Sequence, residues 1–319
     1  MSTLLPEIKA LGTVWWIEIF SEISATKKQV VYDDLLLFIS EFENKYSRFK
    51  PDSLITKLNI TGSLENPDQT TIDLLQTGIN LYKQTDGLFN ILIGEILENR
   101  GYDANYSFTL KEQIITAPNP TTDIIISKDS IILSSGRVDL GGFGKGYLID
   151  LIVKRLKDNF NLEYFLINGG GDIYATSDNG KPIEIYLEHP IEKDTFIGTT
   201  TLLNQGFAAS SPHKRKWKVG DKIFSHIVNT QGESIPIDGT FVKADTVAKA
   251  DAFATVSLLT TPEKIFTFAD KFDLSVAFIK SDDSSLFCCF IIFIPLPLLC
   301  HNHRLYSHSR HHRVTSTFV

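Results

Sequence analysis

The sequence predicts an α+β fold, and two observations carry this prediction. Segments rich in β-branched and aromatic residues, which are typical of strands, mix with segments whose apolar residues recur at helical spacing. These segments follow one another without the regular strand–helix–strand rhythm of a doubly wound parallel sheet. With 319 residues, of which 43% are hydrophobic, the chain has ample apolar surface for a core.

The expected elements are spread along residues 11–280. Strands are expected at residues 11–20, 124–126, 131–133, 164–167, 183–188, 196–203, 222–229 and 274–280. Helices are expected at residues 28–46, 70–84, 246–259 and 262–270, in a short segment that Asp52 or Ser53 caps before Asn59, and around Leu148–Leu156. Arg48 and Asp86 lie in turns between these elements, so we expect both at the surface.

The charge balance and the cysteine positions restrict the function. The chain carries 31 basic and 38 acidic residues, a net charge of −7, whereas nucleic-acid-binding proteins usually show a basic excess or a basic stripe. We therefore expect no nucleic-acid partner. All three cysteines lie beyond residue 283, so residues 1–283 can use neither disulfides nor thiolate metal sites.

The targeting features of the sequence are few. The N-terminal segment MSTLLPEIKA has no cationic region, and Pro6 and Glu7 interrupt its apolar residues. It does not resemble a secretory signal peptide, and no early cysteine could carry a lipid. The long apolar run at residues 286–300 is shorter than the roughly 20 residues that span a bilayer. We expect a cytoplasmic protein without a membrane partner.

Two glycine-rich motifs follow strand-like segments. In Gly141-Gly-Phe-Gly-Lys-Gly146, which leads into a helix, glycines would let backbone N–H groups approach a phosphate at the helix N-terminus. The alternative is a tight strand-to-helix turn, and the motif alone favours neither. It matches neither a Walker A loop nor the dinucleotide fingerprint. Asn168-Gly-Gly-Gly-Asp172 suits close approach by a ligand or another segment, or a simple β-bulge or turn.

Three further residues could carry chemistry. Asp251 and Thr255 are four residues apart on an expected helix, so their side-chain oxygen atoms lie on one face and would suit Mg²⁺. The alternative for this pair is a solvated polar stripe. His226 lies at an expected strand end, where it would be a general base or, as most lone histidines are, a structural residue.

Taken in order, these motifs resemble the FAD:protein FMN transferase (ApbE) family over residues 11–280. The matching segments are Leu11-Gly-Thr13, Ser47-Arg-Phe49, Pro51 to Asn59, Thr85-Asp-Gly-Leu-Phe-Asn90, Asp139-Leu-Gly-Gly-Phe-Gly-Lys-Gly-Tyr147, Asn168 to Asp172, Ala209-Ser-Ser211, His226-Ile-Val228 and Ala250-Asp-Ala-Phe-Ala-Thr255. The resemblance implies a T-fold-like roll of mixed or antiparallel sheets with packed helices. It also implies Mg²⁺-dependent transfer of FMN from FAD to a Thr or Ser hydroxyl of an acceptor flavoprotein, with release of AMP.

The resemblance further implies roles for individual residues. Asp251, Thr255 and the backbone carbonyl of Gly142 would hold Mg²⁺, and His226 would be the base that activates the acceptor hydroxyl. The FAD site would be lined by Leu11, Leu88, Phe89, Asn90, Asp139 and Lys145.

This sequence departs from the family pattern at three places. Asn90 replaces an Asp, which removes a charge near the expected adenosine, and Asn229-Thr230 replaces the usual Asp-Pro after the His226 motif. The third departure is the C-terminal tail. Two other functions therefore stay open, an FAD pyrophosphatase that yields FMN and AMP, and an inactive FAD-binding module.

The tail, residues 284–319, differs from the rest of the chain in composition. It contains all three cysteines, five of the eight histidines, three arginines and no Lys, Asp or Glu. Residues 286–300 show neither strand alternation nor helical periodicity, and the histidine-rich end lacks apolar residues to bury. We expect the tail to lie outside the enzyme domain of residues 1–283, as a disordered or frameshift-derived segment. A membrane-associated tail and a metal-binding tail are the alternatives.

Overall fold

The chain forms two compact units. The computed structural model describes residues 2–111, 115–219, 222–228 and 237–281, together with the backbone of residues 286–289, 294–295 and 314–315. Unit 1 comprises Met1–Leu37, Lys145–Ser211 and Pro236–Val319, and unit 2 comprises Phe38–Gly144 and Pro212–Ile235. The chain therefore passes from unit 2 to unit 1 inside the first glycine-rich motif.

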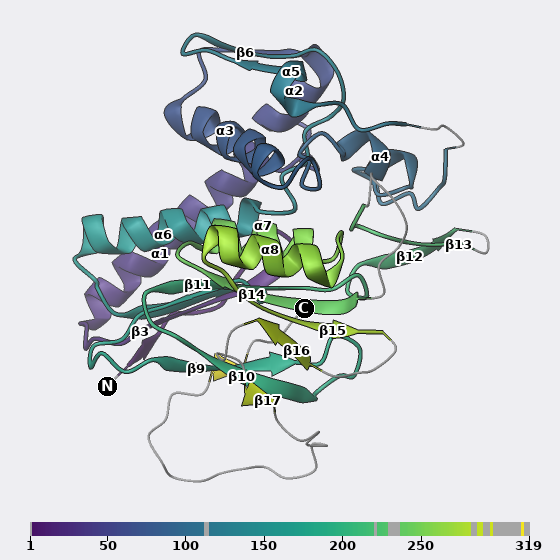
Figure 1. The fold of residues 1–319 in the computed structure, drawn as a ribbon. Helices are drawn as coiled ribbons and strands as arrows, with labels where there is room; N and C mark the ends of the chain where they lie inside the picture. Colours follow the sequence, from purple (N-terminus) through teal and green to yellow (C-terminus); the bar gives the residue numbers. More distant parts are fainter. Residues whose placement is uncertain are drawn as a thin grey trace. The chain divides into compact units, whose positions relative to one another are not determined.

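Unit 1 is built on a large antiparallel sheet (Figure 1). Within the described residues this sheet has nine strands in the order β1-β3-β7-β8-β11-β14-β15-β16, with β2 paired to β3. The strands are β1 (Thr3–Leu4), β2 (Ile8–Ala10), β3 (Thr13–Ile19), β7 (Phe165–Gly169), β8 (Ile173–Ala175), β11 (Gln205–Ser210), β14 (Ile237–Ala244), β15 (Ser275–Lys280) and β16 (Leu286–Cys289). Buried and half-buried residues alternate along β3, as the sequence predicts for this strand.

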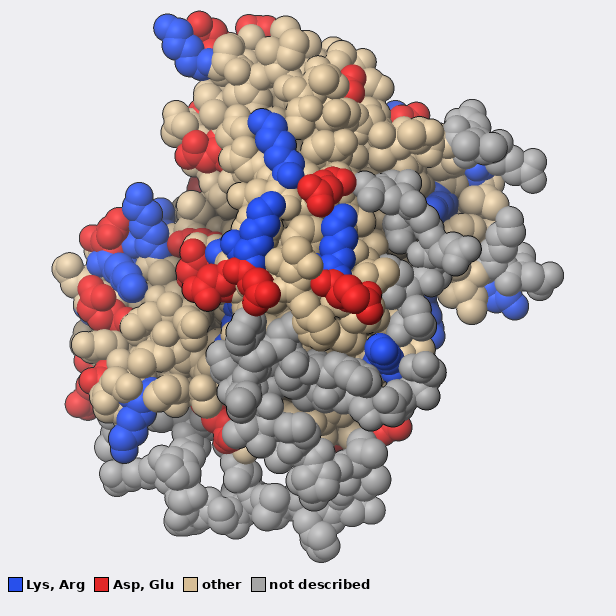
Figure 2. Space-filling model, viewed as in Figure 1, with Lys and Arg blue, Asp and Glu red and all other residues tan. Residues whose placement is uncertain are grey.

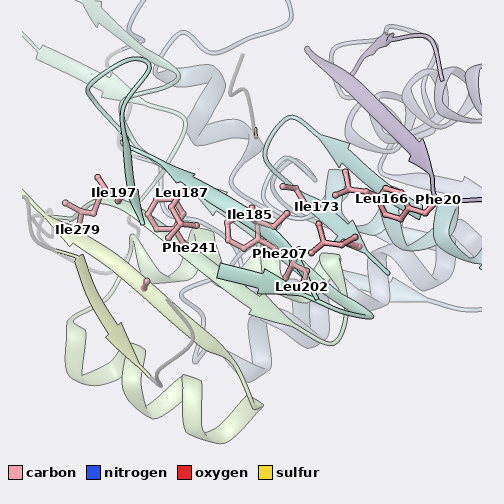
Figure 3. Close-up of a cluster of buried hydrophobic side chains, with 13 residues drawn as sticks. Phe20, Leu166, Ile173, Ile185, Leu187, Ile197, Leu202, Phe207, Phe241 and Ile279 are labelled. Atoms are coloured by element: carbon pink, nitrogen blue, oxygen red, sulfur yellow. The ribbon is translucent and has the colours of Figure 1, made fainter. Parts of the chain in front are cut away.

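A smaller sheet packs on one face of the large sheet. It consists of β9 (Ile183–Glu188), β10 (Phe196–Leu202), β17 (Ile294–Pro295) and β18 (Val314–Thr315), in the order β17-β10-β9-β18. Apolar side chains from both sheets, among them Ile185 and Leu187 of β9 with Phe207 and Phe241 of the large sheet, form one buried cluster (Figure 3). This cluster is the core between the two sheets.

Helices cover the opposite face of the large sheet (Figure 1). They are α6 (Gly144–Phe160), α7 (Val247–Ser257), α8 (Pro262–Phe272) and the first part of α1 (Ala25–Tyr46), which continues into unit 2. Helix α7 is buried over most of its surface and lies against β11 and β14. Its small side chains, such as Ala250 and Ala254, allow this close packing, and Thr246 caps its first turn.

Unit 2 combines short helices with two small sheets. Its helices are α2 (Leu54–Thr61), α3 (Gln69–Gln84), α4 (Gly94–Asn99) and α5 (Pro120–Asp123). Its sheets are β4 (Ser63–Glu65) with β6 (Ser130–Leu133) and β5 (Ile124–Ile126), and the hairpin of β12 (Lys216–Val219) with β13 (Lys222–Ser225). Of the two predicted caps of α2, Ser53 is the one that accepts a hydrogen bond, from the backbone N–H of Thr56.

The α+β fold class is confirmed, but the sequence does not predict β8, β11, β12 or β14. Strand β14 shows why, because its register shifts between Ile237 and Gly239 and it carries a buried lysine. The Lys243 ammonium donates a 3.1 Å hydrogen bond to the carbonyl oxygen of Thr201, and burial lowers the pKa of this lysine to about 8. Lysines usually lie at the surface. A lysine inside a strand therefore interrupts the apolar alternation by which the strand is recognised in a sequence.

The structure also bears on part of the tail. The backbone of Leu286–Cys289 forms β16, which pairs antiparallel with β15. The expectation of no strand in residues 286–300 is therefore wrong for these four residues and for Ile294–Pro295 of β17, because backbone bonding to a sheet edge does not require alternating side chains. The histidine-rich end lies outside the described residues, apart from the backbone of β18. The domain boundary at residue 283 stays a prediction.

None of the described helices is long and apolar enough to cross a membrane.

We predict that a chain ending at residue 283 stays folded and keeps any FAD affinity of the full chain. Strand β15 remains paired to β14 when β16 is removed, and β9 remains paired to β10 when β17 and β18 are removed, so the loss is limited to the bonds of edge strands. We expect a fall of about 1–3 kcal/mol in the free energy of unfolding, measured by urea denaturation. A chain ending at residue 289 retains β16 and is the matched control. Unfolding of the shorter chain alone would show that β16 belongs to the domain.

Candidate active site

The predicted site residues divide between the two units. Unit 1 contains Leu11, Lys145, Asp251 and Thr255, and unit 2 contains Leu88, Phe89, Asn90, Asp139, Gly142 and His226. Each group of residues has contacts within its own unit.

In unit 1, two buried carboxylates share one ammonium group. Lys145, in the first turn of α6, pairs with Asp172 and lies 3.7 Å from the Oδ2 atom of Asp251. Asp172 closes the second glycine-rich motif, after β7, and Asp251 lies on α7. Three segments that are distant in sequence therefore meet at one cluster with an excess of negative charge.

The Asp251 carboxyl is the buried end of this cluster. Burial, and then the neighbouring Asp172 carboxylate, raise the pKa of Asp251 to about 7. Its Oδ2 atom accepts a 3.1 Å hydrogen bond from the backbone N–H of Gly146. Thr255 lies one turn further along α7 and is half-buried. A carboxylate short of positive charge, beside a hydroxyl on the same helix face, is a donor set that fits a hard dication.

The first turn of α7 is held by close contacts on two sides. A Cβ atom at Gly146 would lie 2.5 Å from the carbonyl oxygen of Val247, and one at Gly206 of β11 would lie 2.5 Å from the backbone nitrogen of Val247. On α6, the Asp150 carboxylate accepts 2.9 Å hydrogen bonds from the backbone N–H groups of Val247 and Ala248. These contacts fix α7, and with it Asp251, relative to the start of α6.

The first glycine-rich motif is a tight turn whose N–H groups are mostly used inside the protein. Gly141 N–H donates to the Asp139 carboxylate at 2.7 Å, Gly144 N–H donates to the carbonyl of Leu140 at 2.8 Å, and Gly146 N–H donates to Asp251. The predicted phosphate cradle therefore cannot be formed by these three donors in this arrangement. The geometry favours the alternative, a turn that lets two helices approach each other.

In unit 2, Arg48 is buried, which corrects the expectation of a surface residue. Its Nε atom donates to the Asp139 carboxylate, and its Nη2 atom donates to the carbonyl of Tyr102 at 2.9 Å. The guanidinium also lies 4.2 Å from the centre of the Phe49 ring. Asp86, by contrast, is exposed, as expected. The Ser47-Arg-Phe49 motif and the Asp139 motif thus meet through one buried ion pair.

The Leu88–Asn90 turn contacts the same region of unit 2. The side chains of Leu88 and Phe89 are buried, and the Phe89 ring packs edge-on against the Phe143 ring at 5.9 Å. Their side chains therefore serve the interior of unit 2, and a contribution to FAD binding would come through the backbone of the turn. The backbone N–H of Asp139 donates to the carbonyl of Ile91 at 2.8 Å, which ties the two motifs together.

Asn90 has a structural role that the sequence does not reveal. Its amide nitrogen donates to the carbonyl of Pro118 at 2.9 Å, and its amide oxygen accepts from the N–H of Leu92 at 2.8 Å. An ionised aspartate could accept the second bond but could not donate the first. The departure from Asp to Asn therefore matches the local hydrogen bonding of this chain.

His226 follows β13 at the base of the hairpin and is half-buried. Its backbone N–H donates to the carbonyl of Arg215 at 3.3 Å, and its Nδ1 atom lies 3.3 Å from the same oxygen. A ring whose Nδ1–H is directed at a carbonyl presents Nε2 as the basic nitrogen. Asn229 and Thr230, the second departure, lie outside the described residues.

Two buried polar groups of unit 1 lack hydrogen-bond partners. They are the Thr13 hydroxyl and the Asn168 amide nitrogen, within the described residues. Buried polar groups are nearly always paired, so an unpaired donor marks a place where a ligand or water completes the bonding. Leu11 nearby has a φ of +52°, followed by Gly12 at +70°, in the turn between β2 and β3. A leucine in this region is strained, and such strain is concentrated at functional sites.

Comparison with known proteins shows the family of this chain. A family model described as the ApbE family matches residues 11–279. This chain belongs to the ApbE family. An FAD:protein FMN transferase of Rhodobacter capsulatus is 25% identical over 226 residues. These residues are 67% of this chain and 43% of that protein, so the chain matches less than half of this relative's length. An FAD:protein FMN transferase of Chlamydia pneumoniae is 24% identical over 274 residues, 77% of this chain and 81% of that protein.

Solved structures of ApbE proteins share the fold. The ApbE protein of Thermotoga maritima has a TM-score of 0.80 at 20% identity and covers 90% of this chain and 97% of its own. The flavinyl transferase ApbE of Pseudomonas stutzeri has a TM-score of 0.73 at 17% identity, with 90% and 94% covered. These likenesses confirm the α+β architecture of the ApbE fold in this chain.

Three residues of this ApbE chain hold its motifs in place and are missing from the predicted site. They are Arg48, Asp150 and Asp172. Asp172 could have been found, because it closes a glycine-rich motif. Arg48 lies in the Ser47-Arg-Phe49 motif, but its burial and the role of Asp150 depend on partners about 90–100 residues away in the sequence.

We predict that Asp150 makes the stability of the protein fall between about pH 4 and pH 6. Burial raises the pKa of its carboxyl from 3.8 to about 6, so in this range the folded protein keeps a proton that the unfolded chain has lost. The contribution of Asp150 to the free energy of unfolding is therefore greatest below pH 4 and is lost as the pH rises to 6, by about 2–3 kcal/mol in total. In Asp150→Asn, the free energy of unfolding measured in urea should not show this fall between pH 4 and pH 6. The exposed Asp158→Asn on the same helix is the control, and equal slopes in both variants would contradict the prediction.

Proposed function

We propose that this chain transfers FMN from FAD to a Thr or Ser hydroxyl of an acceptor flavoprotein and releases AMP. The observation that carries the proposal is the cluster of Lys145, Asp172 and Asp251. It gathers two carboxylates and one ammonium at the start of α6, beside a helix that presents a second oxygen ligand. The motifs that surround it follow the order of the ApbE family, and the curated relatives carry this activity in their names.

Asp251, Thr255 and the carbonyl of Gly142 would hold Mg²⁺. When bound, Mg²⁺ neutralises charge on pyrophosphate oxygens and on the departing AMP. The donor chemistry fits, because all three groups are oxygen ligands and the Asp251 carboxylate is undercompensated. Lys145 would add a second positive charge beside the pyrophosphate, held in orientation by Asp172.

His226 would accept the proton of the acceptor hydroxyl. The hydroxyl oxygen then forms a bond to the FMN phosphorus, the P–O bond to AMP breaks, and AMP leaves with the bridging oxygen. The half-buried position of His226 at the end of a hairpin suits a base that must meet another protein. The FAD site would be lined by Leu11, the Leu88–Asn90 turn, Asp139 and Lys145, with the Thr13 hydroxyl and the Asn168 amide as unpaired donors.

The test of the proposal is intact mass. The full chain is incubated with FAD, Mg²⁺ and a flavoprotein acceptor, and both the acceptor mass and the released AMP are measured. Transfer adds one FMN mass to the acceptor. AMP release without a mass change would indicate an FAD pyrophosphatase, and FAD binding without AMP release would indicate an inactive binding module.

We predict that Asp251→Ala and Thr255→Val each abolish Mg²⁺-dependent AMP release while the protein stays folded. The two side chains supply hard oxygen ligands for which alanine and valine have no substitute. AMP release is measured over a Mg²⁺ titration, and folding is checked by thermal unfolding. The double variant Asp270→Ala with Thr267→Val changes an exposed pair on α8 and is the matched control. Wild-type turnover of the α7 variants at limiting Mg²⁺ would refute the metal assignment.

We predict that His226→Gln lowers kcat for flavin transfer by about 10²–10⁴-fold and changes FAD affinity little. Glutamine keeps a hydrogen-bonding side chain but cannot take up the hydroxyl proton in the transition state. The transfer rate is measured by acceptor mass and FAD affinity by flavin fluorescence. Equal losses of rate and FAD affinity would instead assign His226 a structural role.

A further inference from the structure

The hairpin of unit 2 has one inward and one outward face. Strands β12 and β13 pair antiparallel, with Lys216 opposite Ser225, Trp217 opposite Phe224, and Lys218 opposite Ile223. Trp217 is buried, stacks on Tyr102 at 5.2 Å and donates to the carbonyl of Arg100 at 2.7 Å. Because side chains alternate along a strand, its neighbours point the other way. We call this outward side, formed by Lys216, Lys218, Ile223 and Ser225, the hairpin face.

The hairpin face is exposed and carries charge of one sign. Lys216 and Lys218 are exposed, and Ile223 is 71% exposed. The preceding Lys214 is exposed as well, whereas the Arg215 guanidinium donates a 3.4 Å hydrogen bond to the Tyr102 hydroxyl on the inward side. In the sequence 214–225 the only acidic residue is Asp221, which lies between the two strands. On the face in Figure 2 several Lys and Arg side chains lie beside Asp and Glu side chains, and the whole chain has a net charge of −7. A cationic patch on an acidic protein favours a partner of opposite charge.

The hairpin face leads directly to the proposed base. His226 follows Ser225 in the chain, and its backbone N–H and Nδ1 atom both lie 3.3 Å from the carbonyl oxygen of Arg215. An acceptor that contacts the hairpin face would therefore have the proposed base one residue beyond Ser225, at the open end of the hairpin.

We propose that the hairpin face docks the acceptor polypeptide through acidic residues near its Thr or Ser. This inference rests on the proposed function and adds what the acceptor must present. Lys216 and Lys218 are two residues apart on one face of a strand, a spacing of about 7 Å. Acidic residues at alternate positions of an extended chain have the same spacing, and Ile223 offers an apolar contact between the charges.

The same features disfavour a nucleic acid as the occupant. Single-stranded nucleic acids bind where basic side chains alternate with exposed aromatic rings on which bases stack. Here the aromatic side of the hairpin is packed against unit 2, with Trp217 over Tyr102 and the Arg100 guanidinium 5.8 Å from the Phe224 ring. The outward side offers amines, a hydroxyl and one aliphatic side chain.

The test measures binding of labelled peptides to the full chain by fluorescence anisotropy. Three peptides share one threonine and differ only at alternate flanking positions, which are Glu, Gln or Lys. We expect the Glu peptide to bind at least about tenfold tighter than the Gln peptide at low salt, with the difference shrinking as salt is added. The double variant Lys216→Glu with Lys218→Glu should reverse the preference, and Lys216→Gln with Lys218→Gln should remove it.

The control is Lys128→Glu with Lys154→Glu, which makes the same charge change at two exposed lysines that are not part of the hairpin. An equal response of the hairpin and control variants overturns the proposal, as does equal binding of the Glu and Gln peptides by the wild type. Displacement of the Glu peptide by a lower concentration of oligothymidylate would replace it with a nucleic-acid site. Transfer of FMN to a flavoprotein acceptor by the wild type is measured in parallel, by the mass of the acceptor. Absence of transfer with an unchanged preference for the Glu peptide refutes the proposed function alone, whereas transfer without that preference overturns only the docking proposal.

Discussion

The structure of unit 1 depends on two buried carboxylates that share one ammonium. Removing Asp172 and Asp251 from water costs several kcal/mol for each ion unless a cation compensates them, and Lys145 contacts both. The start of α6, the loop after β7 and the first turn of α7 must therefore stay together. Gly146 permits this approach, and Asp150 secures it through two backbone N–H groups of α7. With one ammonium for two carboxylates, the region keeps an excess of negative charge.

Unit 2 uses the same kind of constraint at a different place. Arg48 holds the Asp139 carboxylate, which also accepts the N–H of Gly141, so both the motif and its turn are fixed by one side chain. Because the Asp139 carboxylate has two partners inside the protein, its orientation is fixed and it is not free to turn toward a bound molecule. Asn90 also fixes its own turn, because its uncharged side chain makes hydrogen bonds to the backbone of Pro118 and Leu92. Positions that resemble ligand contacts in the sequence thus first serve to shape their own loops.

The sequence predicts elements whose pattern is local and misses those that depend on distant partners. Strand β3 alternates and α3 is amphipathic, so both are predicted within a few residues. Strand β14 lies in the middle of the large sheet, yet its buried Lys243 and the irregular register at Gly239 hide it. Arg48 is misplaced for the same reason, because its burial depends on Asp139, which is 91 residues away. The order of the motifs is a better guide than the apolar pattern of single segments. It assigns Lys145 and Asp251 to one site, and in the structure these two side chains lie 3.7 Å apart.

The glycine-rich motif shows how one pattern can serve two purposes. Gly141, Gly144 and Gly146 direct their N–H groups into the protein, and a side chain at Gly146 would collide with α7. The motif therefore acts mainly by allowing close packing, whereas the Thr13 hydroxyl and the Asn168 amide nitrogen are buried donors of unit 1 without a hydrogen-bond partner among the described residues. The two buried donors without partners and the strained backbone of Leu11 are locally unfavourable, whereas the surrounding strands and helices have the side-chain patterns typical of their structure. Such failures are expected where a structure is shaped for something other than its own stability.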